Sequence, residues 1–348
     1  MPHNVLAGPR RLVDGSITPV ARTSGPLPRI LRVSTLVSMV MSASATEPRM
    51  TPYGAPYVKP EGLKRQLRAQ LRDGVRVYGT MTARWRVTPD YLIIGAKRGG
   101  TTSLARWVLE HPDVRPLFPA RETRKGAYYF DVNYGRGEAW YRSHFPTRSA
   151  MAQATKKAGR KQLVGEATPY YLHHPHAAIR ARRLAPEAKV IMLLRDPAER
   201  AYSHWVERTR NQVETLAFSD AVDAEAGRLE GEEARMLADP TYNSFAHQHF
   251  SYLDQGRYAR GLRRWVDAFP PDQLLILRSE DMYADPSAIF SQVLDFLGLP
   301  PHALDEFDAW NMKPKEAVEP ELMARIKSEL ADDIAEVEAL LGRSMGWL

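Results

Sequence analysis

The sequence predicts an α/β fold in which a central parallel sheet is flanked by helices. Short, mostly apolar runs, typical of buried parallel strands, occur at residues 91–94, 162–165, 189–194 and 273–277. Between and after them, apolar residues recur with helical spacing at residues 101–110, 175–185, 198–211, 217–236, 257–269, 286–297 and 320–341. Strands that alternate with helices give a parallel sheet covered on both faces.

We expect a single domain preceded by a disordered N-terminal extension. Residues 1–58 mix Pro, Gly, Ser, Thr and Arg without a sustained periodicity. Such a segment buries too little apolar surface to offset the entropy that is lost on ordering. The domain is therefore expected at residues 59–348, with its core at residues 90–348, and this length is sufficient for one large α/β domain.

The distribution of charge argues against a nucleic-acid partner. The chain has a formal charge of +7, but residues 1–90 hold 14 Lys and Arg against 5 Asp and Glu, so the chain from Tyr91 onward is slightly acidic. The predicted domain core is therefore not a polyanion-binding surface in bulk. The basic stretch at residues 64–86 is either an exposed amphipathic helix or a membrane-facing arm.

The absence of cysteine excludes disulfides and thiolate chemistry. It fits a reducing compartment, and we expect the protein to be cytoplasmic. No apolar run reaches the roughly 18 residues that are needed to span a bilayer, so no integral membrane segment is expected. The sequence does not indicate the oligomeric state.

A Gly-rich turn joins the first predicted strand to the first predicted helix. It reads Gly95-Ala-Lys-Arg-Gly-Gly-Thr-Thr-Ser103. In this context backbone N–H groups can surround phosphate oxygens, and glycine permits a close approach. The spacing of Gly95 and Gly100 is P-loop-like, but Thr101 stands where a nucleotide kinase or NTPase carries Lys. We predict a phosphate-binding loop whose cations are Lys97 and Arg98, with a degenerate kinase or NTPase as the alternative.

A second motif follows the third predicted strand. Arg195 ends that strand, and Ser203 lies eight residues further on, in the next predicted helix. Helix geometry lets both side chains converge on one anion beside the carboxyl end of the strand, where ligands bind in open α/β sheets. The alternative is that Arg195 pairs with Asp196 and that Ser203 lies on a solvated helix face.

The two motifs together resemble those of the sulfotransferases that use 3′-phosphoadenosine-5′-phosphosulfate (PAPS), especially the bacterial members and the heparan sulfate sulfotransferase branch. The resemblance spans about residues 90–348. Further stretches in family order are His111-Pro-Asp-Val, Glu166-Ala-Thr-Pro-Tyr-Tyr, Gly256-Arg-Tyr, Phe296-Leu-Gly-Leu-Pro and Gly346-Trp. The resemblance implies transfer of a sulfuryl group from PAPS to a hydroxyl or amine of a carbohydrate, glycolipid or small-molecule acceptor. It also implies release of PAP and no need for a metal.

The resemblance assigns roles to individual residues. Lys97 and Arg98 would hold the phosphosulfate and stabilise the leaving nucleotide, and Arg195 with Ser203 would hold the 3′-phosphate. The cradle of the phosphosulfate would be Gly99, Gly100, Thr101, Thr102 and Ser103. Near the C-terminus, Lys313 and Lys315 would close over the nucleotide, with plain surface lysines as the alternative.

The chain departs from the family pattern at the loop cation and at the general base. Arg98 stands where the family usually has Lys, and a planar guanidinium is not equivalent to a compact ammonium. The heparan branch has a Glu base where this sequence has Gly126 or Ala127, and Tyr128 stands where relatives often have His.

The missing Glu leaves the base to be chosen from other residues. Glu166 is our first candidate because it ends a predicted strand beside the loop, and a structural role for it is equally open. Glu122 is second, and His173 or His174 third. If none of them serves, the chain is a non-catalytic PAP-binding protein.

Overall fold

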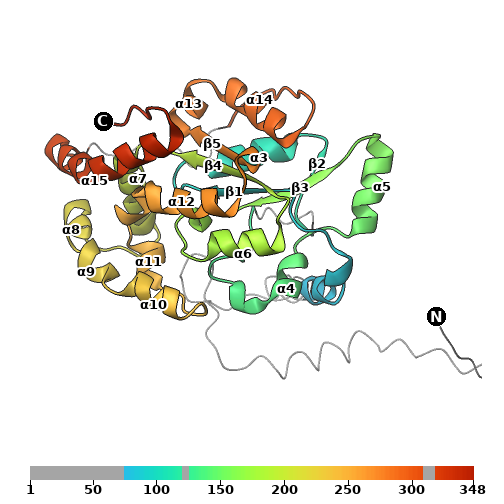
Figure 1. The fold of residues 1–348 in the computed structure, drawn as a ribbon, viewed down its shortest axis with the longest axis horizontal. Helices are drawn as coiled ribbons and strands as arrows, with labels where there is room; N and C mark the ends of the chain where they lie inside the picture. Colours follow the sequence, from blue (N-terminus) through green and yellow to red (C-terminus); the bar gives the residue numbers. More distant parts are fainter. Residues whose placement is uncertain (1–73, 120–124, 309–317) are drawn as a thin grey trace, which may run out of the picture. The chain divides into compact units, whose positions relative to one another are not determined.

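A five-stranded parallel sheet forms the centre of the structure, a computed structural model that describes residues 74–119, 125–308 and 318–348 (Figure 1). The described residues lie in one unit, Pro48–Leu348. The strand order is β2-β3-β1-β4-β5, with bounds β1 (Tyr91–Gly95), β2 (Val114–Arg115), β3 (Leu163–Ala167), β4 (Lys189–Leu194) and β5 (Leu274–Arg278). The predicted α/β fold is confirmed. The predictions for residues 1–58, Glu122, Lys313 and Lys315 lie outside the described residues.

Helices follow most of the strands. The α-helices are α3 (Thr101–Glu110), α4 (Glu138–Arg142), α5 (Arg148–Ala158), α6 (Ala177–Leu184), α7 (Pro197–Arg210), α8 (Phe218–Asp223), α9 (Glu225–Leu229), α10 (Glu232–Ala238), α11 (Phe245–His249), α12 (Tyr258–Ala268), α13 (Ser279–Ala284), α14 (Pro286–Leu297) and α15 (Pro320–Leu341). Residues 74–81 are also helical. The 3₁₀ turns are η1 (Ala83–Trp85), η2 (Tyr134–Arg136), η3 (Pro169–Leu172), η4 (Asp254–Gly256) and η5 (Pro271–Gln273).

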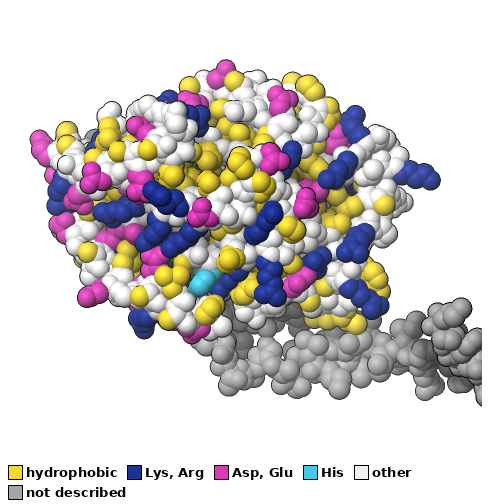
Figure 2. Space-filling view, viewed as in Figure 1, with side chains coloured by type: hydrophobic (Ala, Val, Ile, Leu, Met, Phe, Trp, Pro, Cys, Tyr) yellow, Lys and Arg dark blue, Asp and Glu magenta, His cyan; other side chains and the backbone are white. Residues whose placement is uncertain are grey.

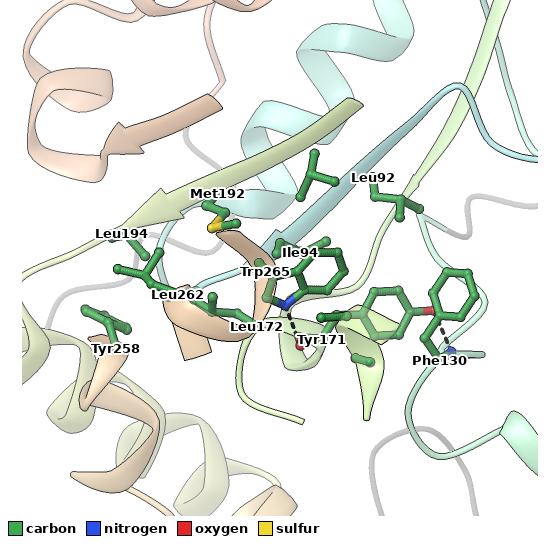
Figure 3. Close-up of a cluster of buried hydrophobic side chains, with 14 of the residues drawn as sticks. Leu92, Ile94, Phe130, Tyr171, Leu172, Met192, Leu194, Tyr258, Leu262 and Trp265 are labelled. Atoms are coloured by element: carbon green, nitrogen blue, oxygen red, sulfur yellow. Dashed lines mark hydrogen bonds between the residues drawn. The ribbon is translucent and has the colours of Figure 1, made fainter. Parts of the chain in front are cut away.

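Both faces of the sheet are buried, which explains the continuous apolar runs. All five residues of β1 are buried, and its side chains alternate between two hydrophobic clusters. Leu92 and Ile94 belong to the cluster that contains α12, whereas Ile93 belongs to the cluster that contains α3 and α14. Figure 3 shows the first cluster, in which side chains of β1 and β4 meet Leu262 and Trp265 of α12.

Some of the helices begin at a residue whose side chain accepts a hydrogen bond from their first N–H groups. Asp196 caps α7: its Oδ1 accepts hydrogen bonds from the N–H groups of Ala198 (2.9 Å) and Glu199 (3.1 Å), and Pro197 occupies the first turn. Asp285 caps α14 in the same way. Because α7 directly follows β4, this cap fixes the helix that carries Ser203 relative to the sheet.

The single helix predicted over residues 217–236 is three separate helices in the structure. The pattern over residues 217–236 divides into α8, α9 and α10, and Gly231 has a left-handed conformation, with φ of 72°, at the start of α10. A chain that enters the left-handed region at one residue leaves the helix there.

The charged side chains on the face shown in Figure 2 are intermingled, with Lys and Arg beside Asp and Glu rather than in one continuous basic area. Within the described ranges, no helix is both long enough and apolar enough to cross a membrane.

Candidate functional site

The Gly-rich turn lies at the carboxyl end of β1, between β4 and α13. The N–H of Ala96 donates to the carbonyl of Leu193 in β4 (2.6 Å), and the hydroxyl of Ser279 donates to the carbonyl of Gly99 (2.6 Å). The N–H of Gly99 donates to the carbonyl of Ala96 (2.9 Å), which closes the turn. The loop is thus held from both sides at the sheet edge where ligands bind in α/β folds.

Glycine is required at both central positions of the turn. A Cβ on Gly99 would lie 2.5 Å from the carbonyl oxygen of Leu193, and Gly100 has φ of +94°. A Cβ on Gly100 would also lie 2.6 Å from the methyl group of Met282. No side chain caps α3, which begins at Thr101. The residue before the helix is Gly100, which has no side chain to cap it, and a helix start of this kind can bind an anion.

The two predicted anion-binding motifs meet in the structure. Arg98 Nε donates to Ser203 Oγ (3.0 Å), and an Arg195 guanidinium nitrogen donates to the carbonyl of Arg98 (3.4 Å). Arg98 also lies 3.7 Å from Glu207, and Arg195 lies 3.2 Å from Glu199. The loop and the end of β4 therefore bring Arg98 and Arg195 to one region, where α7 contributes Ser203.

The alternative for the second motif is wrong. Asp196 does not pair with Arg195 but caps α7 and lies 3.2 Å from the amine of Lys327. Ser203 is only 3% exposed, so it does not lie on a solvated helix face.

Lys97 and Arg98 contact different neighbours, although they are adjacent in the sequence. Lys97 Nζ lies 2.8 Å from His204 Nε2 and 3.4 Å from the carbonyl of Gln248. Burial is the main cause that holds the pKa of Lys97 well below its ordinary value, and the positive charge of Arg208 is the second. Burial and the Lys97 ammonium likewise keep the pKa of His204 low, so this imidazole is neutral and accepts from Lys97. The structure thus brings Arg98, not Lys97, to Ser203 and Arg195.

Lys125 is a site residue that the sequence analysis missed. Its amine donates to Thr102 Oγ1 in the first turn of α3 (2.7 Å). Burial, together with the cations Arg98 and Arg106, lowers the pKa of Lys125 to about 8, and Glu207 opposes the shift. The signal in the sequence that could have identified Lys125 was its position next to Gly126, in the stretch where the family's Glu base was expected.

Glu166 is hydrogen-bonded on both carboxylate oxygens. It accepts from the N–H of Ala127 (2.5 Å), the hydroxyls of Tyr141 (2.7 Å) and Tyr171 (3.0 Å), and Thr168 Oγ1 (3.3 Å). The residue is 2% exposed, and burial raises its pKa despite these bonds. A buried carboxylate with four protein donors holds the segment around Ala127 to β3, which favours the structural role over that of a base.

No side chain fits at Gly126, one of the two positions at which the Glu of the heparan branch was expected. A Cβ on Gly126 would lie 2.3 Å from Thr168 Oγ1 and 2.4 Å from the carbonyl oxygen of Ala167. The chain there lies directly against the end of β3, since the N–H of Ala167 donates to the carbonyl of Lys125 (2.7 Å). The backbone packing at Gly126 therefore leaves no space for a carboxylate side chain.

His173 and His174, the third candidates for the general base, are buried beside η3. His173 Nε2 lies 3.2 Å from Asp254 Oδ2, and the ring of His174 packs edge-on against Tyr170. Burial lowers the pKa of both imidazoles.

Comparisons with known proteins identify a family and relatives for this chain. A family model described as "Sulfotransferase domain" matches residues 88–334. The membrane-associated sulfotransferase kil1 of Dictyostelium discoideum is 24% identical over 353 residues, which cover 82% of this chain and 71% of that protein. The bifunctional heparan sulfate N-deacetylase/N-sulfotransferase 3 of Homo sapiens is 33% identical over 217 residues, which cover 62% of this chain and 23% of that protein. The crystal structure of a sulfotransferase from Alicyclobacillus acidocaldarius is 26% identical, with a TM-score of 0.55, and the match covers 75% of this chain and 99% of that one.

Proposed function

This chain belongs to the sulfotransferase domain family, and we propose that it transfers a sulfuryl group from PAPS to a hydroxyl or amine of an acceptor. The observation that carries the proposal is the meeting of Arg98, Ser203 and Arg195 at the Gly-rich loop. A nucleotide with phosphate groups at both ends needs two anion-binding groups on one edge of the sheet, and this arrangement supplies them. The kinase alternative is disfavoured by the family match.

Each residue has a defined part in the proposed reaction. The 5′-phosphosulfate binds to the loop and the first turn of α3, and Arg195 with Ser203 binds the 3′-phosphate. The bond between the sulfur and the bridging oxygen breaks as the acceptor atom bonds to the sulfur, so negative charge grows on the departing phosphate. Arg98 stabilises that charge. We assign Lys125, which contacts Thr102, as a second cation for the same charge.

In this proposal Lys97 supports the loop and does not bind the donor directly. Its amine is bonded to His204 and Gln248, so it contributes to the positive field of the site and positions the turn rather than gripping the donor. Glu166 remains a candidate base only if its four hydrogen bonds rearrange. The acceptor proton otherwise passes to a group of the acceptor site or to water.

The similarity to the heparan sulfate enzyme supports a carbohydrate acceptor. Glycolipids and small molecules are the alternative acceptors to be tested. The similarity to a membrane-associated sulfotransferase supports a test of membrane binding. A cytoplasmic location remains our prediction, because the chain has no cysteine. Fractionation of cells that produce the native protein measures both.

Nucleotide binding tests the site directly. We expect Arg98→Ala and Arg195→Ala each to weaken PAP binding by about 10–100-fold, because each removes a charge-assisted hydrogen bond worth about 1.5–3 kcal/mol. Titration calorimetry measures the change. Arg148→Ala, at the exposed start of α5, is the matched control and should bind like the wild type. Wild-type affinity in both site variants contradicts the proposal.

Transfer of label from ³⁵S-PAPS to a panel of glycans, glycolipids and phenols separates an enzyme from a binding protein. We expect label in one acceptor class and its loss in Arg98→Ala. If PAP binds tightly while every acceptor stays unlabelled, the non-catalytic alternative, which the packed Gly126 position supports, replaces the enzyme.

A further inference from the structure

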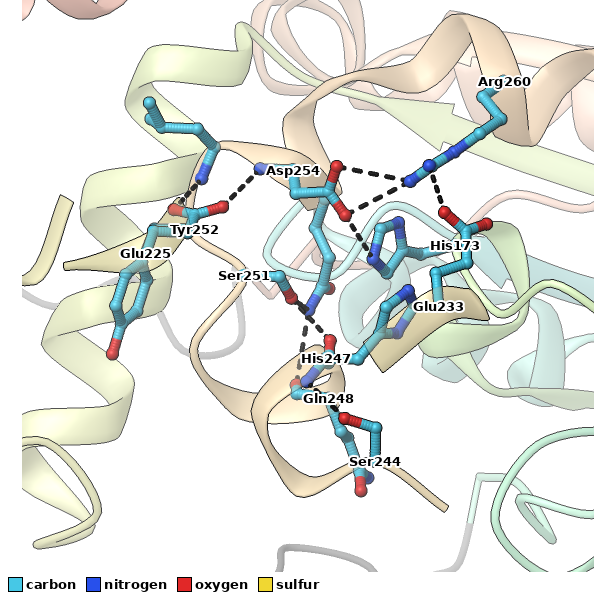
Figure 4. Close-up of polar contacts among 12 residues, drawn as sticks. His173, Glu225, Glu233, Ser244, His247, Gln248, Ser251, Tyr252, Asp254 and Arg260 are labelled. Atoms are coloured by element: carbon cyan, nitrogen blue, oxygen red, sulfur yellow. Dashed lines mark hydrogen bonds and ion pairs between the residues drawn. The ribbon is translucent and has the colours of Figure 1, made fainter. Parts of the chain in front are cut away.

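Two buried histidines and one partly buried aspartate bring their metal-binding atoms together behind η3. His173 directly follows η3, His247 lies in α11 and Asp254 begins η4. One ligand atom from each residue lies within 4.8 Å of the other two. The exposed fractions of His173 and His247 are 7% and 2%. Figure 4 shows the two imidazole rings beside the Asp254 carboxylate.

One imidazole nitrogen of the cluster lacks a hydrogen-bond partner among the described residues, and another faces only the Asp254 carboxylate. Nε2 of His247 makes no hydrogen bond within the part of the chain that the structure describes. Nε2 of His173 lies 3.2 Å from Asp254 Oδ2 without forming a directed hydrogen bond. The rings are stacked, with centroids 4.1 Å apart and planes 18° from parallel. Buried polar atoms of this kind cost free energy unless a ligand satisfies them.

The groups around the cluster orient its ligand atoms. His247 Nδ1 lies 2.7 Å from the hydroxyl of Tyr170, which leaves Nε2 directed into the cluster. The N–H of Asp254 donates to Glu225 Oε1 (2.7 Å), which fixes the start of η4. Partners of this type, on the atoms that do not ligate, are those that hold metal ligands in place.

The charged groups around the cluster are paired with one another. Arg260 lies 3.2 Å from both oxygens of Asp254, but it also pairs with Glu233, which in turn pairs with Arg264. The two carboxylates therefore balance the two guanidinium groups before any ion binds.

We propose that His173, His247 and Asp254 bind one divalent transition-metal ion of the Zn²⁺ type, with water in the fourth position. Two imidazoles and one carboxylate are typical ligands for zinc, whereas Mg²⁺ and Ca²⁺ prefer oxygen alone. Bond lengths of about 2.1 Å require the three side chains to close by on the order of 1 Å. The ion joins the end of η3 to α11 and η4, since His173 lies 74 residues before His247 and 81 residues before Asp254. Its three ligands differ from the residues that we propose to bind PAPS.

Cobalt titration tests the site without any assumption about activity. The full-length protein, without a histidine tag, is stripped with EDTA, dialysed and titrated with Co²⁺, and the visible d–d absorption is recorded. We expect bands of a four-coordinate ion that saturate at one equivalent and disappear when Zn²⁺ is added. Zn²⁺ should also raise the melting temperature of the stripped protein.

The variants His247→Phe and Asp254→Asn keep the volume of the side chains while each removes a ligand. Each should weaken Co²⁺ binding at least tenfold, while His302→Ala, outside the cluster, binds like the wild type. Far-UV circular dichroism checks that the variants fold. The proposal is overturned if the wild-type protein shows no saturable Co²⁺ bands, or if a folded ligand variant shows the same bands and affinity.

Discussion

Lys97 and Arg98 show how one backbone residue separates two neighbouring cations. Arg98 has φ of 71°, in the left-handed region that few non-glycine residues adopt. The turn there sends the guanidinium toward Ser203 and the Lys97 amine toward His204. Burial lowers the pKa of both side chains, which disfavours their charged forms, and a bound anion relieves that cost. An unusual backbone conformation at a site of this kind is a reason to look for function there.

The pKa of Lys125 gives the site a pH dependence. With a pKa of about 8, the ammonium loses its proton as the pH rises through 8, so we expect PAP affinity to fall between about pH 7.5 and 9. Lys125→Arg should abolish this fall, because guanidinium stays charged. Lys125→Met should weaken binding at pH 7 and also flatten the profile. Calorimetry at several pH values measures it, and an unchanged profile in Lys125→Arg rejects the assignment.

At the scale of single elements, the loop between β1 and α3 is the most tightly constrained segment of the site. Its glycines lie against β4 and α13, and its backbone is bonded to Leu193 and Ser279. The helix that follows begins without a side-chain cap. A loop with packed glycines that leads directly into a helix start is suited to close contact with an anion.

Gly99→Ala should disturb the loop and little else. Its Cβ would meet the Leu193 carbonyl at 2.5 Å, and backbone atoms cannot move aside as a side-chain tip can. We expect a loss of about 1–3 kcal/mol in the free energy of unfolding, together with weaker PAP binding. Gly135→Ala, where nothing lies within 4 Å, should change stability by less than about 0.5 kcal/mol. Urea unfolding compares the two, and equal stability of both variants would contradict this account of the loop.

At the scale of the whole molecule, the C-terminal segment closes the α12 side of the sheet. Ile326 and Leu330 of α15 belong to the same core cluster as β1 and β4, as does Trp347. The carbonyls near the chain end are also held, that of Trp347 by Lys327 (2.9 Å) and that of Met345 by Arg278 (2.7 Å). Segments from the two ends of the described chain therefore share one core.

Trp347→Ala should be strongly destabilising, since this side chain is 2% exposed and its removal leaves a cavity. We expect a loss of about 3–5 kcal/mol, measured by urea unfolding. Leu348→Ala is the control, because Leu348 is 70% exposed and should be near neutral. A small effect of Trp347→Ala would mean that the C-terminal segment contributes little to the core.

The sequence predicted those parts of the fold and site that depend on local pattern. Four of the five strands and the bounds of α3, α14 and α15 follow from apolar runs and helical spacing. The α5 helix was missed because it has no buried residue and hence no clear apolar stripe, and β2 has only two residues. The contacts of Lys125 with Thr102 and of Lys97 with His204 join segments 23 and 107 residues apart, which no local pattern encodes. The role of Glu166 likewise depends on tyrosines that only the folded chain brings to it.

The strand order also has a consequence for how the chain is made. β1, at the middle of the sheet, is paired by β3 and β4, which end 72 and 99 residues later. At about 5–20 residues per second of translation, an apolar strand emerging from the ribosome waits about 5–20 s for its second neighbour. We therefore expect the yield of native protein to rise when the chain is overproduced at low temperature or together with an excess of a ribosome-associated chaperone.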